Sequence, residues 1–240
     1  MGHPKLCEVF ALIDSAVAES VLPLVVFDLD STLFSTEPRN WRIITEFTAA
    51  HGDEYPGLRE LVDSMSLSDM GWGVIDPFAE RGFTEPAFKK ALSRFWGKRF
   101  FSNAYVISDE PTPGAVEFAQ ECHRRGAMLY YLTGRHVSDM GAGTVEALTS
   151  SGFPFWRGRC SLHLKPSFEL SDKPFKDEAL KDIKSNRGRV VATFENEPGN
   201  ANLFMDAFPS ALHFLLETTH STEAEVPYPE LLSGKDFLLS

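Results

Sequence analysis

Residues 24–33, Leu-Val-Val-Phe-Asp-Leu-Asp-Ser-Thr-Leu, decide the fold of this 240-residue chain. The apolar run that leads into Phe27 has no polar interruption, which indicates a parallel strand covered on both faces. The run ends in Asp28 and Asp30, whose side chains lie on the same side of an extended chain, roughly 7 Å apart. Two like charges at one buried edge are costly unless a cation or a difference in protonation relieves them. The stretch therefore predicts a buried strand with a charged site at its carboxyl end, and the alternative is a turn in which Ser31 and Thr32 cap a helix.

Strand and helix patterns alternate through most of the chain. Apolar runs predict strands at 22–27, 127–132, 160–164, 190–194 and 211–216. Helical periodicity and stop signals predict helices at 4–19, 113–125 and 138–151, with further helices starting near Asp172 and following Pro198. Strands that alternate with helices indicate an α/β fold with a doubly wound, Rossmann-like parallel sheet. We expect this core to comprise residues 1–33 and 109–240.

Residues 34–108 differ in character from the rest of the chain. They are rich in aromatic residues, and three segments carry apolar residues at helical spacing, starting at Trp41, Leu58 and Phe88. We expect a mostly helical insert with its own small core. The stretch Gly71-Trp72-Gly73 within it predicts a mobile turn, and a segment that contacts the substrate is the alternative. Beyond Thr222 the sequence resembles a linker that Phe237, Leu238 and Leu239 anchor.

The bulk composition excludes several classes of partner. A formal net charge of −11 disfavours nucleic acid and anionic membranes, and no apolar run is long enough to span a bilayer. The cysteines Cys7, Cys122 and Cys160 are scattered, which predicts reduced, mostly buried thiols. The seven histidines show no paired spacing, so zinc is not expected. With no targeting signal visible, a cytoplasmic protein is the residual expectation.

Ligands of open α/β sheets bind beyond the carboxyl ends of the strands. Two further predicted strands end there in reactive groups, which are Thr133 with Gly134 and Glu195 with Asn196. Lys176 lies in the first turns of a predicted helix, where a cation opposes the helix dipole. A lysine in such a turn can also simply face solvent, so the pattern counts only in combination.

In combination, these stretches resemble the haloacid dehalogenase-like superfamily. Phe27-Asp28-Leu29-Asp30-Ser31-Thr32 is similar to its first motif, and Leu132-Thr133-Gly134 to its second. Phe175-Lys176 resembles the third motif, and Phe194-Glu195-Asn196-Glu197 stands at the acidic fourth. The resemblance spans about residues 20–216, with the insert where the family has a helical cap between motifs one and two. It implies a phosphatase.

The residue chemistry suits hydrolysis of a small phosphorylated metabolite. We expect Asp28 to attack phosphorus and form an aspartyl-phosphate, with Asp30 as the general acid and base. Thr133, Gly134, Lys176 and Arg135 are expected to bind the phosphoryl group. Mg²⁺ would bind the Asp28 carboxylate, the Asp30 carbonyl, Glu195 and Asn196.

Several assignments stay open at this stage. Lys173 is the alternative to Lys176, while Glu197 or Asn200 could complete the metal site. Arg135 could equally form a surface salt bridge, and His136 is expected in a solvated loop. A phosphomutase or phosphotransferase would use the same residues, and a dehalogenase would have no use for Asp30. Because the fourth motif departs from the family pattern, a retired enzyme that serves as a binding or scaffold protein is a further alternative. The sequence reveals neither the substrate nor the oligomeric state.

Overall fold

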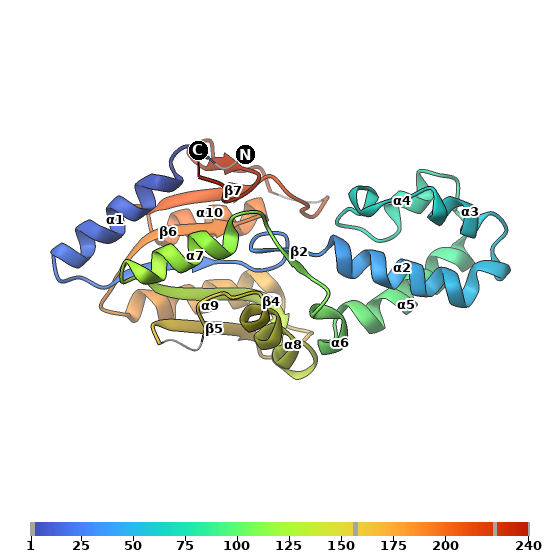
Figure 1. Cartoon of the computed structure of the whole chain (residues 1–240), viewed down its shortest axis with the longest axis horizontal. Coiled ribbons are helices and arrows are strands. Elements are labelled where there is room, and N and C mark those ends of the chain that lie inside the picture. Colours follow the sequence, from blue (N-terminus) through green and yellow to red (C-terminus); the bar gives the residue numbers. More distant parts are fainter. Residues whose placement is uncertain (1–2, 156–157, 223–224, 240) are drawn as a thin grey trace.

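The computed structural model describes residues 3–155, 158–222 and 225–239. Its main sheet has six strands in the order β5-β4-β1-β6-β7-β8, and every neighbouring pair is parallel (Figure 1). The strands are β1 (Pro23–Phe27), β4 (Met128–His136), β5 (Cys160–Lys165), β6 (Arg189–Glu195), β7 (Leu212–Leu216) and β8 (Leu232–Gly234). The predicted α/β fold with a parallel sheet is confirmed.

Helices cover both faces of this sheet. One face carries α1 (Leu6–Ala18), α7 (Ala115–Arg124) and α8 (Val137–Ser150), and the other carries α9 (Asp172–Ser185) and α10 (Pro198–Ala207) (Figure 1). Strand β1 lies between them and is buried throughout. Its Val25 and Phe27 pack into the cluster of α1, α7 and α8, while Leu24 and Val26 pack into the cluster of α9 and α10. Burial on both faces explains why the strand is an uninterrupted apolar run.

The position of β1 in the sheet fixes the site. It pairs with β4 on one side and β6 on the other, so Phe27 lies opposite both Tyr131 and Phe194. The backbone N–H of Asp28 donates to the carbonyl of Phe194 at 3.0 Å, which extends the pairing one residue past the strand. The carboxyl ends of β1, β4 and β6 therefore meet at one edge of the sheet.

Between β1 and β4 the chain forms a separate helical layer (Figure 1). It contains α2 (Glu37–His51), α3 (Leu58–Asp63), α4 (Asp76–Ala79), α5 (Pro86–Phe100) and two 3₁₀ turns, Gly52–Glu54 and Leu67–Asp69. The short helix α6 (Asn103–Val106) follows α5 but packs on α8 of the core, with Val106 in the cluster of the sheet. Its hydrophobic cluster, which includes Phe47 and Phe88, is distinct from those of the sheet. The two connections to the core pair as an antiparallel ladder, β2 (Phe34–Ser35) with β3 (Glu110–Pro111).

Four local predictions were wrong. Strand β4 continues through Thr133 to His136, where its register with β5 shifts, instead of ending at Leu132. His136 is consequently buried at the sheet edge rather than solvated. The tail adds strand β8 at the sheet edge instead of forming only a linker. Anchoring of the tail by Phe237, which is buried, is confirmed, whereas Leu238 and Leu239 are half-exposed. Of the three free cysteines Cys122 is buried, Cys160 is half-buried and Cys7 is exposed, because Cys7 faces away from the sheet on α1.

Within the described residues, none of the helices combines the length and apolar character that a membrane crossing requires.

Candidate active site

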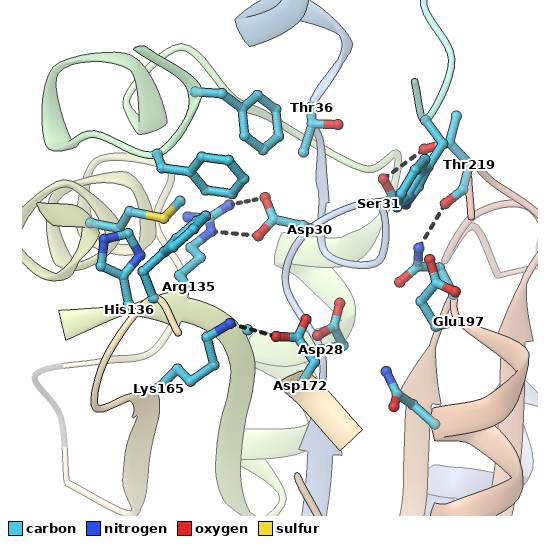
Figure 2. A pocket seen from close by; sticks show the side chains of 18 of the residues that line it. Asp28, Asp30, Ser31, Thr36, Arg135, His136, Lys165, Asp172, Glu197 and Thr219 are labelled. Carbon is cyan, nitrogen blue, oxygen red and sulfur yellow. Dashed lines mark hydrogen bonds and ion pairs between the residues drawn. The ribbon is translucent and has the colours of Figure 1, made fainter. Parts of the chain in front are cut away.

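The first-motif loop bends sharply after β1 and holds its two acids at different depths. Asp28 is 4% exposed, whereas the side chain of Asp30 is 32% exposed toward the cavity above it (Figure 2). Ser31 adopts φ 58°, a left-handed conformation that is uncommon for a residue with a side chain. The Thr32 hydroxyl donates to the Asn196 side-chain oxygen at 3.2 Å, which ties this loop to the end of β6.

Lys176 joins two of the carboxylates. Its Nζ donates to Asp28 Oδ1 at 2.7 Å and to Glu195 Oε2 at 2.6 Å, and all three residues are buried. One ammonium thus serves two carboxylates, and one unit of buried negative charge is left over. Burial and the charge of Glu195 accordingly raise the pKa of Asp28, although Lys176 opposes that rise.

The side chain of Asp30 is held by two arginines. Arg135 donates from Nε to Oδ2 at 2.9 Å and from Nη2 to Oδ1 at 3.0 Å, and Arg39 of α2 donates from Nη2 to Oδ1 at 2.7 Å (Figure 2 shows the Arg135 pair). Both arginines also bind Asp109, with Arg39 Nε at 2.8 Å from Oδ1 and Arg135 Nη2 at 2.7 Å from Oδ2. We call Arg39, Asp30, Arg135 and Asp109 the charge cluster.

The contacts of Asp30 with Arg135 and Arg39 affect its expected role as the general acid. Desolvation alone would raise the pKa of Asp30, but the charges of Arg135 and Arg39 outweigh it and hold the pKa well below its usual range. A general acid must carry a proton near neutral pH, so its pKa has to be raised rather than lowered. In this conformation Asp30 is therefore an ionised acceptor, and proton donation requires that the arginines withdraw from it.

The second motif approaches the site through its backbone. Gly134 lines the cavity, and a Cβ atom there would lie 2.3 Å from Oδ2 of Asp172, so a side chain at this position would have to displace the Asp172 carboxylate. The Thr133 side chain is buried, and its hydroxyl accepts the backbone N–H of Arg135 at 3.2 Å. Asp172 also accepts from Lys165 Nζ at 2.7 Å (Figure 2).

The geometry separates the candidates that the sequence left open. Lys173 is exposed and pairs with Glu225, whereas Lys176 reaches Asp28. The side-chain nitrogen of Asn196 donates to the Thr219 carbonyl at 2.7 Å, so its amide is engaged on both atoms. Glu197 accepts from the backbone and the hydroxyl of Ser221. Asn200 lines the cavity nearby.

A cavity of about 690 Å³ lies between the helical layer and the carboxyl edge of the sheet. Asp28, Asp30, Gly134, Arg135, Lys176 and Glu195 line its core side. The helical layer contributes aromatic residues, among them Trp72, Trp96 and Phe100.

Sequence reasoning missed Arg39 and Asp109. Both are buried, and they are 70 residues apart, because Arg39 follows β2 and Asp109 directly precedes β3. Their contact follows no local spacing that a sequence pattern could show. Arg39 precedes the helical segment predicted to start at Trp41, and only the structure places it in the first turn of α2, where a cation is electrostatically disfavoured.

Comparison of the sequence with family models found no match, and comparison with curated proteins found none. The structure, by contrast, resembles many solved structures. One is a candidate phosphatase from Clostridium difficile, with a TM-score of 0.55 and 14% identity over 85% of this chain and 89% of that chain. Another is a haloacid dehalogenase-superfamily hydrolase of subfamily IA from Geobacter sulfurreducens, with a TM-score of 0.52 and 15% identity over 83% and 89% of the two chains. The chain has the fold of the haloacid dehalogenase-like hydrolases.

Proposed function

We propose that the protein is a magnesium-dependent phosphatase that hydrolyses a small phosphorylated metabolite through an aspartyl-phosphate. The observation that carries this proposal is the Lys176 bridge between Asp28 and Glu195, at 2.7 and 2.6 Å, at the carboxyl edge of the sheet. Asp28 and Lys176 are 148 positions apart in the chain, and they come from the stretches that resemble the first and third motifs. The fold supports the same conclusion, because both solved structures described above bear hydrolase or phosphatase names.

Lys176 and Asp28 have separate tasks in this reaction. Lys176 occupies Oδ1 of Asp28, and the other oxygen would attack phosphorus. The new O–P bond forms as the P–O bond to the substrate oxygen breaks, and the departing alkoxide takes a proton from Asp30, which must first lose its arginine partners. Water then attacks phosphorus, gives one proton back to Asp30 and releases phosphate, which restores the Asp28 carboxylate. Lys176 lowers the cost of bringing an anionic substrate to two buried carboxylates.

The donor set fits Mg²⁺. Mg²⁺ is usually held by one or two carboxylates and completes its shell with water and substrate oxygens. Asp28, Glu195 and the Asp30 carbonyl would hold it, and the unit of negative charge that Lys176 leaves uncompensated favours a cation. In the described part of the chain, no three His, Cys, Asp or Glu side chains cluster around one point, so water and phosphate must supply the other ligands. When bound, the metal supplies positive charge to the phosphoryl oxygens.

Residues 34–108 are proposed to serve as the cap of this site. Their helices lie opposite the carboxyl edge of the sheet, and their two connections to it, through residues 34–36 and 108–111, run side by side. A layer joined by two adjacent strands can close over a small substrate and exclude water. Arg39 of this layer holds Asp30, so we infer that cap movement withdraws one of the two arginines that hold Asp30. Arg135 lies on β4 of the core and must turn away from Asp30 separately.

Replacement of the nucleophile tests the proposal. Asp28→Asn should lower phosphate release from 4-nitrophenyl phosphate with Mg²⁺ to background, while the circular dichroism spectrum stays that of the wild type. Asp53→Asn is the matched control, because Asp53 is an exposed acid that forms an ion pair with Arg59, away from the cavity. Wild-type turnover in Asp28→Asn would overturn the assignment of the nucleophile.

A second candidate function is a phosphate-ester binding protein without turnover. The arginine clamp on Asp30 favours it, because an ionised Asp30 cannot protonate a leaving alcohol. Calorimetry separates the two candidates. If the protein only binds, the wild type would show heat of binding with a phosphorylated ligand but would release no phosphate from any ester of a metabolite panel. A phosphatase would release phosphate from at least one of these esters.

A further inference from the structure

Beyond the charged floor, the cavity has an aromatic wall that the proposed chemistry does not use. The helical layer supplies Trp72, Trp96 and Phe100, Phe101 follows α5, and the core supplies Phe168. Trp96 stacks on Phe100 with ring centroids 4.5 Å apart, and Phe101 meets Phe168 edge to face at 5.0 Å. Phe101 also meets Phe100 edge to face at 5.1 Å, so the rings from Trp96 to Phe168 are in continuous contact between the helical layer and the core.

Two rings of this wall are unusually exposed. Trp72 is 55% exposed and Phe168 is 54% exposed, although both line the cavity. They come from opposite sides, because Trp72 lies before α4 in the helical layer and Phe168 lies between β5 and α9 in the core. A large aromatic side chain gains most when it is buried, so exposed rings at a cavity point to a ligand that covers them.

The charges of the cavity limit what that ligand carries. Its described lining residues include three cations, and each is paired with carboxylates: Lys176 with Asp28 and Glu195, Arg135 with Asp30 and Asp109, and Lys165 with Asp172. Glu169 and Glu197 line the cavity as well. A second phosphate would therefore meet no free cation among these residues and several acids, which disfavours bisphosphates.

Resting on the phosphatase function proposed above, we propose that the substrate is a phosphate monoester whose alcohol carries a flat aromatic or heteroaromatic ring. The phosphate lies at Asp28 and Lys176, and the ring lies against the aromatic wall between Trp72 and Phe168. The volume of about 690 Å³ is large enough for a ligand of drug-like size.

The test compares two phosphonates, which have a C–P bond in place of the ester oxygen and are not hydrolysed. One is 2-(1-naphthyl)ethylphosphonate, and the other is 2,3-dihydroxypropylphosphonate. Calorimetry with the wild-type chain and Mg²⁺ should give at least about tenfold tighter binding of the naphthyl compound, in line with burial of its ring. Trp72→Ala and Phe168→Ala should each weaken the naphthyl compound about two- to tenfold and leave the dihydroxypropyl compound unchanged.

Tyr228→Ala is the matched control, since Tyr228 is 40% exposed and is not among the residues that line the cavity. It should change neither affinity. Three outcomes would each overturn the inference. The wild type could bind both phosphonates equally, it could fail to bind the naphthyl compound, or Trp72→Ala and Phe168→Ala could weaken the binding of both compounds equally.

A separate measurement shows whether the proposed function fails instead. The matching esters, 2-(1-naphthyl)ethyl phosphate and glycerol 3-phosphate, both release an alkyl alcohol, so their intrinsic reactivities are similar. Selective binding of the naphthyl phosphonate without phosphate release from either ester would leave the aromatic site standing and refute the phosphatase.

Discussion

Replacement of Arg39 by Met tests the charge cluster in the most direct way. Arg39 is fully buried, and it donates to Asp30, to Asp109 and to the Phe100 carbonyl at 3.1 Å. Its guanidinium also lies 4.3 Å from the centre of the Phe100 ring. Methionine matches the arginine side chain as far as Nε and has no charge and no strong hydrogen-bond donor. The substitution therefore removes the charge while it keeps much of the apolar packing.

The magnitude follows from counting charges. In the wild type, Arg39 and Arg135 balance Asp30 and Asp109, whereas Arg39→Met leaves two acids with one guanidinium. Removal of one partner from a buried ion pair costs about 3–5 kcal/mol. A domain of ordinary stability has about 5–15 kcal/mol in total, so the loss is a large share of it.

The assay is urea unfolding followed by circular dichroism and tryptophan fluorescence. Arg59→Met is the control, because Arg59 is half-exposed and pairs with the exposed Asp53, and such pairs contribute about 0–1 kcal/mol. The double variant Arg39→Met with Asp109→Asn restores the balance of charge and should cost less than the sum of the single changes. The reasoning is refuted if Arg39→Met loses no more stability than Arg59→Met.

Two further predictions concern stability. Phe237→Ala should lower the free energy of unfolding by about 3–5 kcal/mol, since this ring is 1% exposed and packs on Phe194 at 5.2 Å. Leu238→Ala, at a half-exposed position, should cost far less in the same urea titration, and equal losses would mean that the tail does not dock. Burial lowers the pKa of His213, so near its unfolded pKa the imidazole is protonated in the unfolded chain and neutral in the folded chain. The free energy of unfolding therefore falls as the pH drops below about 6.5. His213→Asn should flatten this dependence between pH 7.5 and 5.5, and an unchanged slope in urea midpoints would contradict the assignment.

Local sequence signals were enough to predict the fold class and the edge of the sheet at which the site forms. An uninterrupted apolar run such as 22–27 is a local signal, because each residue of a strand buried on both faces must be apolar. The acids that follow it are equally local, and parallel strands bring their carboxyl ends together whatever their order. For this reason the amino-acid sequence alone predicted that Asp28 and Glu195 lie at the same edge of the sheet, and the structure brings Lys176 of α9 into contact with both. Their catalytic roles stay a prediction.

Which groups touch one another depended on the packing of elements that are distant in the chain. Lys173 and Lys176 are three residues apart on one helix, and packing against the sheet turns one toward Glu225 and the other toward Asp28. The pairing of Arg39 with Asp109 spans 70 residues and follows no period, because it depends on the antiparallel pairing of β2 with β3, which brings the two ends of the helical layer together. Strand β8 has three residues, too few for an alternating pattern, and it forms because the edge of β7 offers backbone partners. Periodicity records burial along one element, whereas the charge state of Asp30 depends on contacts between elements, and those exist only once the chain has folded.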